Sequence, residues 1–132
     1  MNSIRQDTEA MEWASAEPFF GPGAIYQDKE IVQLKVLSDR RREGGGIAWL
    51  LRFCPPEDKV IRVVAVAQSD EHIFGLEGGR GTKSGGPLRS RGNYSINPKG
   101  KPHSAFIATE TVALVIYTGE PDEVQSVDVI DK

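Results

Sequence analysis

Short apolar stretches recur along the chain, and most of them alternate between apolar and polar positions. In residues 93–97, for example, Tyr94 and Ile96 share one face at a period of two, as in a half-buried strand. No long stretch keeps the period of an amphipathic helix. The pattern therefore predicts an all-β protein with little helix, whose strands cover residues 30–37, 47–53, 59–67, 71–78, 88–97, 103–107, 111–117 and 124–130.

Turn-forming residues separate these predicted strands. Gly, Pro, Asp or Ser bounds each of them, which is typical of a β-sandwich or β-barrel with short connections. One connection, residues 78–87, is rich in glycine, and we interpret it as a hairpin connection. Phosphate binding is the less favoured alternative there, because a phosphate loop needs a helix directly after it and this segment leads into a predicted strand.

The N-terminal region differs from the rest of the chain. Residues 13–22 contain three aromatic residues and two prolines, a composition that argues against both a helix and a central strand. We expect the aromatic side chains to pack onto a finished core or onto a partner subunit. With 132 residues the chain has the length of one domain, so we divide it into an N-terminal arm, residues 1–22, and a β-barrel, residues 23–132.

Composition and charge exclude several classes of protein. A hydrophobic content of 39% and a charged content of 27% are typical of a soluble globular protein. The net charge of −3 argues against binding to nucleic acid, and acids interrupt the one basic cluster, Asp39–Glu43, which we interpret as a solvated loop. No apolar run is long enough to cross a membrane, and the N-terminus lacks the apolar core of a signal peptide. We therefore expect a cytoplasmic protein without a membrane partner.

Cys54 is the only cysteine, which excludes an intrachain disulfide. A chain without disulfides carries no sign of an oxidising compartment. Because Cys54 ends the apolar segment Trp49–Cys54, we expect a small core residue there rather than a nucleophile.

The most specific pattern in the chain runs from Gly92 to His103. Four residue types stand at fixed offsets, in the form G-x5-P-x-G-x2-H, and Pro98 and Gly100 form a tight turn between two short strands. This spacing resembles the second sequence motif of the cupin superfamily. The resemblance implies a single-domain, cupin-like jelly-roll barrel, also called a double-stranded β-helix, with His103 facing into the barrel. The asparagine that many cupins carry four residues further on is Ile107 here.

The resemblance extends upstream to the first cupin motif, but only in part. Glu71 and Gly78 have the spacing of its second half, whereas the two histidines of its H-x-H pair fall on Ala65 and Ala67. A typical metal-dependent cupin holds its metal through three histidines and a glutamate, and only Glu71 and His103 match that set. The prediction is therefore an incomplete site without a resident metal, able at most to bind a divalent transition metal weakly.

His72 would supply a third metal ligand only if its strand contained a bulge. In a regular strand neighbouring side chains point to opposite faces, so His72 points outward if Glu71 points inward. We therefore expect a surface or interface histidine at this position.

The predicted barrel interior is mostly apolar. With Ala65 and Ala67 inward, strand alternation places Ile61 and Val63 inward as well. The small residues in place of the two histidines leave space for an organic ligand. We expect its pocket to be lined by Trp49, Leu51, Phe53, Ile61, Val63, Ala65 and Ala67.

These residues leave two functions open. In the first, the protein binds a small organic molecule in the barrel, with Glu71 and His103 as a polar anchor or as a catalytic acid–base pair. In the second, it is a metal-dependent cupin enzyme, such as a dioxygenase, lyase or isomerase, with an atypical Glu/His site. Ala65 and Ala67 argue against the oxygenase, because they stand where the resemblance implies metal-ligating histidines. Whether the protein is an enzyme stays open on these residues.

Some apolar side chains are predicted to face away from the barrel, because a barrel of this size cannot enclose them all. They are Leu50, Val64, Val66 and Ile116. No predicted helix covers this second apolar face, so we expect it to be buried in a homodimer.

Overall fold

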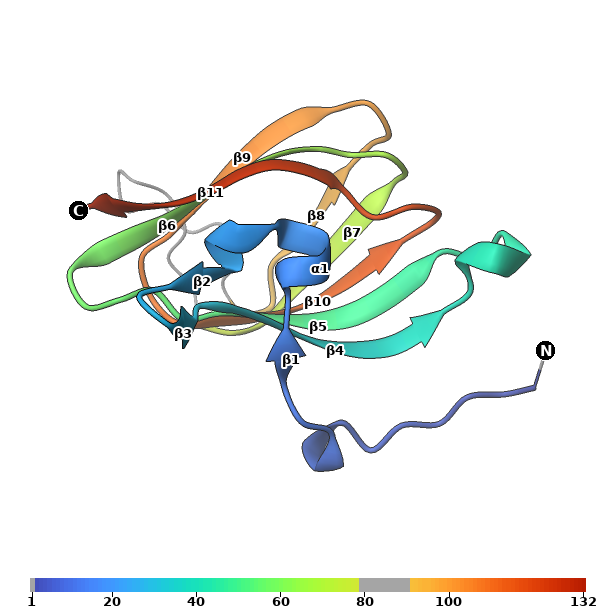
Figure 1. Cartoon of the computed structure of the whole chain (residues 1–132). Helices are drawn as coiled ribbons and strands as arrows, with labels where there is room; N and C mark the ends of the chain where they lie inside the picture. Colours follow the sequence, from blue (N-terminus) through green and yellow to red (C-terminus); the bar gives the residue numbers. More distant parts are fainter. Residues whose placement is uncertain (1, 79–90) are drawn as a thin grey trace.

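The computed structural model describes residues 2–78 and 91–132, which form two antiparallel sheets that face each other (Figure 1). Within these residues the larger sheet has six strands, in the order β1-β4-β5-β10-β7-β8. Their bounds are Ala14–Ser15 (β1), Val32–Asp39 (β4), Ile47–Phe53 (β5), Thr111–Tyr117 (β10), Glu71–Glu77 (β7) and Tyr94–Asn97 (β8). Within the same described residues the smaller sheet has the strand order β11-β6-β9. The bounds of its strands are Glu123–Asp131 (β11), Lys59–Val66 (β6) and Pro102–Ile107 (β9). The all-β fold predicted from the sequence is confirmed.

The remaining elements are short. The strands β2 (Ile25–Tyr26) and β3 (Lys29–Glu30) form a hairpin. Single helical turns occur at η1 (Thr8–Ala10), α1 (Glu17–Phe20), η2 (Pro22–Ala24) and η3 (Arg41–Glu43). Nowhere in the described ranges is a helix long and apolar enough to cross a membrane.

Strand alternation fills the space between the sheets. Along β6, Ile61, Val63 and Ala65 are buried while Arg62 is exposed, which confirms the predicted inward face of this strand. Alternate residues of β5 are buried in the same way, from Ile47 to Phe53. Each fully buried Leu, Ile or Phe contributes about 1.5–3 kcal/mol, so this interior is the main source of stability. The largest fully buried side chains are Trp49, Phe53, Leu51, Ile61, Ile107, Val32, Val115 and Thr111.

Residues 13–22 pack against the two sheets. The strand β1 pairs with β4 at the edge of the larger sheet, and α1 lies beside β11 of the smaller one (Figure 1). The prediction that this segment contains no helix is wrong, because Pro18 occupies the first turn of α1, where its missing amide hydrogen is not needed. The expected packing of aromatic residues onto the core is confirmed, since the rings of Phe19 and Phe20 lie 4.9 and 6.5 Å from that of Trp49.

Most strands begin and end within two residues of their predicted bounds. Of the strand predicted at 88–97, only Tyr94–Asn97 is a strand (β8) among the described residues; residues 91–92 form a turn instead, residue 93 lies between this turn and β8, and residues 88–90 lie outside the described residues. The glycine-rich connection also lies outside them, apart from Gly78. That residue has a φ of +80°, and a Cβ atom there would overlap the carbonyl oxygen of Glu110. Only glycine fits this position, which ends the first cupin-like motif.

Candidate functional site

Glu71, His103 and Asp122 come together between the two sheets. Glu71 is the first residue of β7, His103 lies on β9 of the opposite sheet, and Asp122 directly precedes β11. Each residue offers one ligand atom, and these atoms all lie within 4.8 Å of one another. The structure thus brings Glu71 and His103 together, as strand parity predicts, and adds a third residue to them.

Short distances join the three side chains. His103 Nε2 lies 2.8 Å from Asp122 Oδ2 and 3.4 Å from Glu71 Oε1. The side chains of Glu71, Asp122 and His103 are only 3%, 6% and 15% exposed. The group is therefore a buried cluster of two carboxyl groups around one imidazole nitrogen.

The neighbouring strands orient Glu71 through hydrogen bonds to both of its oxygens. Asn97 Nδ2 donates to Oε1 and the Tyr117 hydroxyl donates to Oε2, each at 2.9 Å. Both donors are register partners of Glu71, on β8 and β10 respectively. A row of inward side chains across three strands thus holds this carboxylate in one orientation.

Asp122 is held less completely than Glu71. Its Oδ2 contacts His103, but its Oδ1 is buried and has no hydrogen-bond partner. In the register of the smaller sheet, Ala65 pairs with His103 on one side and with Val124 on the other. The small side chain of Ala65 separates His103 from the start of β11, and it leaves room for the imidazole and the Asp122 carboxylate to meet above it.

The charges of this cluster do not balance by themselves. Two buried carboxylates are costly unless they are paired, and a protonated imidazole offers only one positive charge. The walls of the surrounding cavity contain no lysine or arginine among the described residues. A divalent cation with a neutral imidazole would neutralise both carboxylates, and one nitrogen with two carboxylate oxygens is a donor set that suits first-row transition metals. Together with the orphaned Asp122 Oδ1, this donor set fits a metal ion.

The cavity beside the cluster is small. The volume open to the centre of a water molecule is about 10 Å³, roughly what one water needs and far below that of an ordinary ligand pocket. Phe20 of α1 forms one of its walls. Of the seven residues predicted to line the pocket, Leu51, Phe53, Val63 and Ala65 do so, whereas Trp49, Ile61 and Ala67 are buried elsewhere in the interior.

No protein-family model and no curated protein matches the sequence, but solved structures match it by shape. A protein of unknown function from Ralstonia eutropha JMP134, described as having a cupin-like fold, aligns with a TM-score of 0.61 at 17% identity. The alignment covers 89% of this chain and 66% of that one. The chain has a cupin fold.

Other cupin-fold structures align over similar lengths. KdgF from Halomonas sp. matches with a TM-score of 0.54 at 15% identity, over 89% of this chain and 94% of that one. Fe(II)-HppE, solved with an alternative substrate, matches with a TM-score of 0.55 at 13% identity, over 87% of this chain and 60% of that one. At these identities the likeness establishes the fold, and the function has to be argued from the site.

Within the cupin fold, Asp122 is the functional candidate that sequence reasoning missed. It stands in the turn between β10 and β11, where no alternation or motif marks it. The signal that could have found it is the pairing of β11 with β6, which brings the residues before Val124 to the His103 end of the smaller sheet. That pairing joins segments far apart in the sequence and follows from the topology alone.

His72 lies on the other face of β7, as strand alternation predicts. Its Nδ1 lies 2.6 Å from the Tyr94 hydroxyl oxygen, and the two rings stack with their centroids 6.0 Å apart. It does not belong to the group of Glu71, His103 and Asp122.

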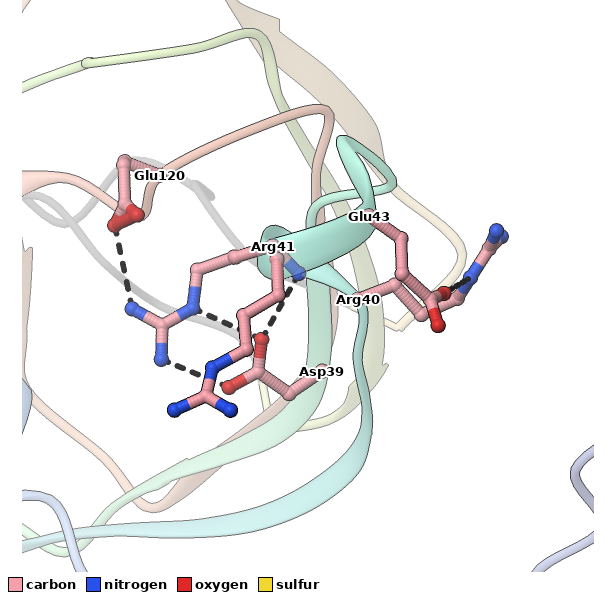
Figure 2. Close-up of a pocket in the computed structure, with 6 residues that line it drawn as sticks. Asp39, Arg40, Arg41, Glu43 and Glu120 are labelled. Atoms are coloured by element: carbon pink, nitrogen blue, oxygen red, sulfur yellow. Dashed lines mark hydrogen bonds and ion pairs between the residues drawn. The ribbon is translucent and has the colours of Figure 1, made fainter. Parts of the chain in front are cut away.

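A second charged cluster, which we call the arginine loop, comprises residues 39–43 and borders a depression of about 640 Å³ (Figure 2). The Arg41 guanidinium lies between the carboxylates of Asp39 and Glu120, at 2.8 and 3.2 Å. Hydrogen bonds from Arg41 hold the pKa of Asp39 below its usual value, and the same contacts raise the pKa of Arg41. The loop is largely exposed, in agreement with the solvated loop predicted from the sequence.

Cys54 follows β5 and is half-buried. Burial raises the pKa of its thiol, which keeps the thiolate scarce at neutral pH. Cys54 is not a lining residue of the cavity around Glu71, so it takes no part in the candidate site.

Proposed function

We propose that this cupin-fold protein binds one divalent transition-metal ion through Glu71, His103 and Asp122, and that the loaded site acts on a small organic molecule. The observation that carries the proposal is the third ligand. With Glu71 and His103 alone the site would hold a metal weakly, whereas three converging ligands are the usual number for a catalytic metal that keeps positions open for water or substrate. Fe(II)-HppE, which has the same fold, contains Fe(II), and this favours the same class of cofactor here.

Each residue has a distinct part in this proposal. Asn97 and Tyr117 would keep the Glu71 carboxylate in the orientation that the ion needs. His103 Nε2 can bind a metal only without its proton, so loading would release protons from the cluster. A bound ion would supply Lewis-acid chemistry, polarising a substrate oxygen or lowering the pKa of a bound water.

A metal-free acid–base function is the second candidate. The contact of 2.8 Å between Asp122 Oδ2 and His103 Nε2 is the arrangement in which a carboxylate orients a catalytic histidine. In this alternative His103 exchanges protons with the substrate, and Glu71 is the second member of the pair. This alternative is the first function that the sequence left open, a protein that binds a small organic molecule and uses Glu71 and His103 as an acid–base pair.

An organic substrate would need more space than the cavity has with α1 in place. Phe20 forms a wall of this cavity, and Gly21, with a φ of +81° and open space around it, follows directly. Movement of α1 about this glycine would enlarge the cavity without breaking a strand pairing. We therefore expect the substrate to be a small molecule that enters on the α1 side.

The metal proposal is tested by metal content. Untagged protein is dialysed separately against Fe(II) without oxygen, Mn(II), Co(II), Ni(II) and Zn(II), and the bound metal per chain is measured. We expect one ion per chain for at least one metal, its loss in Asp122→Asn, and no change in Asp128→Asn, an exposed position on β11. A wild type that retains none of the five would rule out the metal site and leave the acid–base candidate.

We also propose that the protein is a homodimer formed through the outer face of the larger sheet. Phe74, Tyr94, Ile96 and Ile116 are large apolar side chains exposed on this face. In the strand register Phe74 lies opposite Tyr94, and His72 lies between Ile116 and Ile96, so the four form one continuous patch. None of the four side chains carries a charge, so a second copy can pack on them through apolar contacts.

Light scattering tests the dimer. We expect a mass of two chains at tens of micromolar for the wild type and of one chain for Phe74→Lys. The matched control is Val36→Lys, which places the same charge at an exposed apolar position on β4, near the opposite edge of the sheet. A monomeric wild type would contradict the proposal.

A further inference from the structure

The turn that carries Asp122 is anchored to its neighbours through its backbone. Gln68 Nε2 donates to the Pro121 carbonyl oxygen and Ser69 Oγ donates to the Glu120 carbonyl oxygen, both at 2.8 Å. These anchors come from the turn between β6 and β7. Because Asp122 Oδ1 has no partner of its own, the position of this side chain depends on how firmly the turn is held.

Arg41 holds the same turn through a side chain. Its Nη1 donates to Glu120 Oε2 at 3.2 Å, although the two residues are 79 positions apart in the sequence (Figure 2). Its Nε and Nη2 donate to the two oxygens of Asp39 at 2.9 and 2.8 Å. The bidentate pair with Asp39 fixes the plane of the guanidinium, so the contact with Glu120 comes from an already oriented group.

Arg41 also contacts α1, the helix that contributes Phe20 to the wall of the cavity. Its guanidinium carbon lies 5.6 Å from the ring centroid of Phe19, in cation–π geometry. Phe19 neighbours Phe20, which forms a wall of the cavity, and Arg41 itself is not a lining residue. One side chain thus connects the arginine loop, α1 and the Asp122 turn without reaching the cluster.

We propose that Arg41 is a positioning residue that, through Glu120, holds the Asp122 carboxylate where it can complete the metal site. This inference rests on the proposed metal-binding function. Exposed ion pairs contribute little to global stability, so Arg41 acts on the geometry of the turn and not on the fold. Removing a residue that orients a metal ligand typically costs 10–100-fold in affinity, and we expect about tenfold for this more remote contact.

The test compares Co(II) binding in five proteins. They are the wild type, Arg41→Ala, Arg41→Lys, Glu120→Gln and the control Arg42→Ala. Arg42 is the neighbouring arginine on the same loop, and within the described residues it makes no ion pair. Affinity is measured by titration, coordination by the visible absorption of bound Co(II), and folding by the thermal midpoint of the metal-free protein.

We expect Arg41→Ala and Glu120→Gln to bind Co(II) about tenfold more weakly than the wild type, with a changed absorption spectrum and an unchanged metal-free midpoint. Arg41→Lys should lie in between, because lysine keeps the charge but not the bidentate fork. Arg42→Ala should match the wild type.

Three results would overturn the inference in different ways. If the wild type binds Co(II) and Arg41→Ala and Glu120→Gln bind it equally well with the same spectrum, Arg41 has no positioning role and the metal site stands. If the metal-free midpoints fall together with affinity in both variants, the role is structural. If the wild type does not bind Co(II), the metal site itself fails and this inference fails with it.

Discussion

The cluster around His103 and the cluster around Arg41 have similar contents and opposite surroundings. Each places one basic group between two carboxyl groups, and the turn between β10 and β11 contributes to both, through Asp122 and Glu120. The His103 cluster is buried between the sheets, whereas the Arg41 side chain is 30% exposed and its two partners are more exposed still.

The difference in burial decides what each cluster can do. Water solvates the charges around Arg41, so an excess of one sign there costs little and the ion pairs contribute at most about 1 kcal/mol each. Around His103 the same excess of negative charge is expensive and is relieved by a proton or a metal ion. The buried cluster is therefore the candidate for metal binding or acid–base chemistry, and for the exposed one we propose only the role of connecting segments.

The largest effect should come from removing the central base of the buried cluster. In His103→Ala, Glu71 and Asp122 lose the imidazole that contacts both of them, which we expect to cost roughly 1–3 kcal/mol of unfolding free energy and to abolish metal binding. Chemical denaturation and metal titration measure the two effects.

His72→Ala is the matched control, because His72 is the sequence neighbour of Glu71 on β7 but lies on the outer face of the larger sheet. It should leave metal binding intact. If it proved more damaging to metal binding than His103→Ala, the assignment of the inner face of β7 to the site would be wrong.

Neutralising one buried acid should abolish metal binding while leaving the stability of the metal-free protein nearly unchanged. In Asp122→Asn the metal-free protein has less uncompensated charge, so its unfolding free energy should stay within about 1 kcal/mol of the wild-type value. At a metal concentration of one hundred times the dissociation constant, the wild type should gain about 2.7 kcal/mol and the variant almost nothing. Thermal unfolding with and without metal measures both. A metal-free variant that loses several kcal/mol would show that Asp122 is a structural partner of His103.

The smallest effect should come from the exposed cluster. Arg41 lowers the pKa of Asp39 in the folded protein, so at acidic pH the unfolded chain binds more protons. The contribution of Asp39 is therefore present above about pH 4 and is lost as the pH falls through its folded pKa. Because this side chain is 41% exposed, Asp39→Asn should cost less than about 1 kcal/mol at pH 7.

Urea unfolding of wild type and Asp39→Asn checks the pH dependence. The difference between the two proteins should shrink towards zero at the lowest pH at which both remain folded. If Asp39→Asn lowers the unfolding free energy by the same amount at pH 7 and at this lowest pH, the contact is not electrostatic.

The fold was predictable because its determinants are local. Alternation places Ile61, Val63 and Ala65 on one face of β6, and the spacing from Gly92 to His103 locates the turn before β9. The short helix α1 was not predicted, because two prolines and three aromatics within ten residues argue against a helix, and four residues are too few to show a period.

The candidate site was predictable only in part. Glu71 and His103 follow from their motif positions and from strand parity. Asp122 does not, because its closeness to His103 depends on β11 pairing with β6 across the sheet. The size of the cavity depends on the packing of Phe20 against the opposite wall, and no pattern along the chain encodes that packing.

We propose that Glu71, His103 and Asp122 together hold one metal ion. Anomalous diffraction from crystals grown with Co(II) tests it most directly, because it locates the ion itself. We expect one strong peak per chain at roughly 2.0–2.2 Å from His103 Nε2 and from a carboxylate oxygen of both Glu71 and Asp122. A well-occupied peak that omits Asp122, or no peak among these three residues at saturating Co(II), would contradict it.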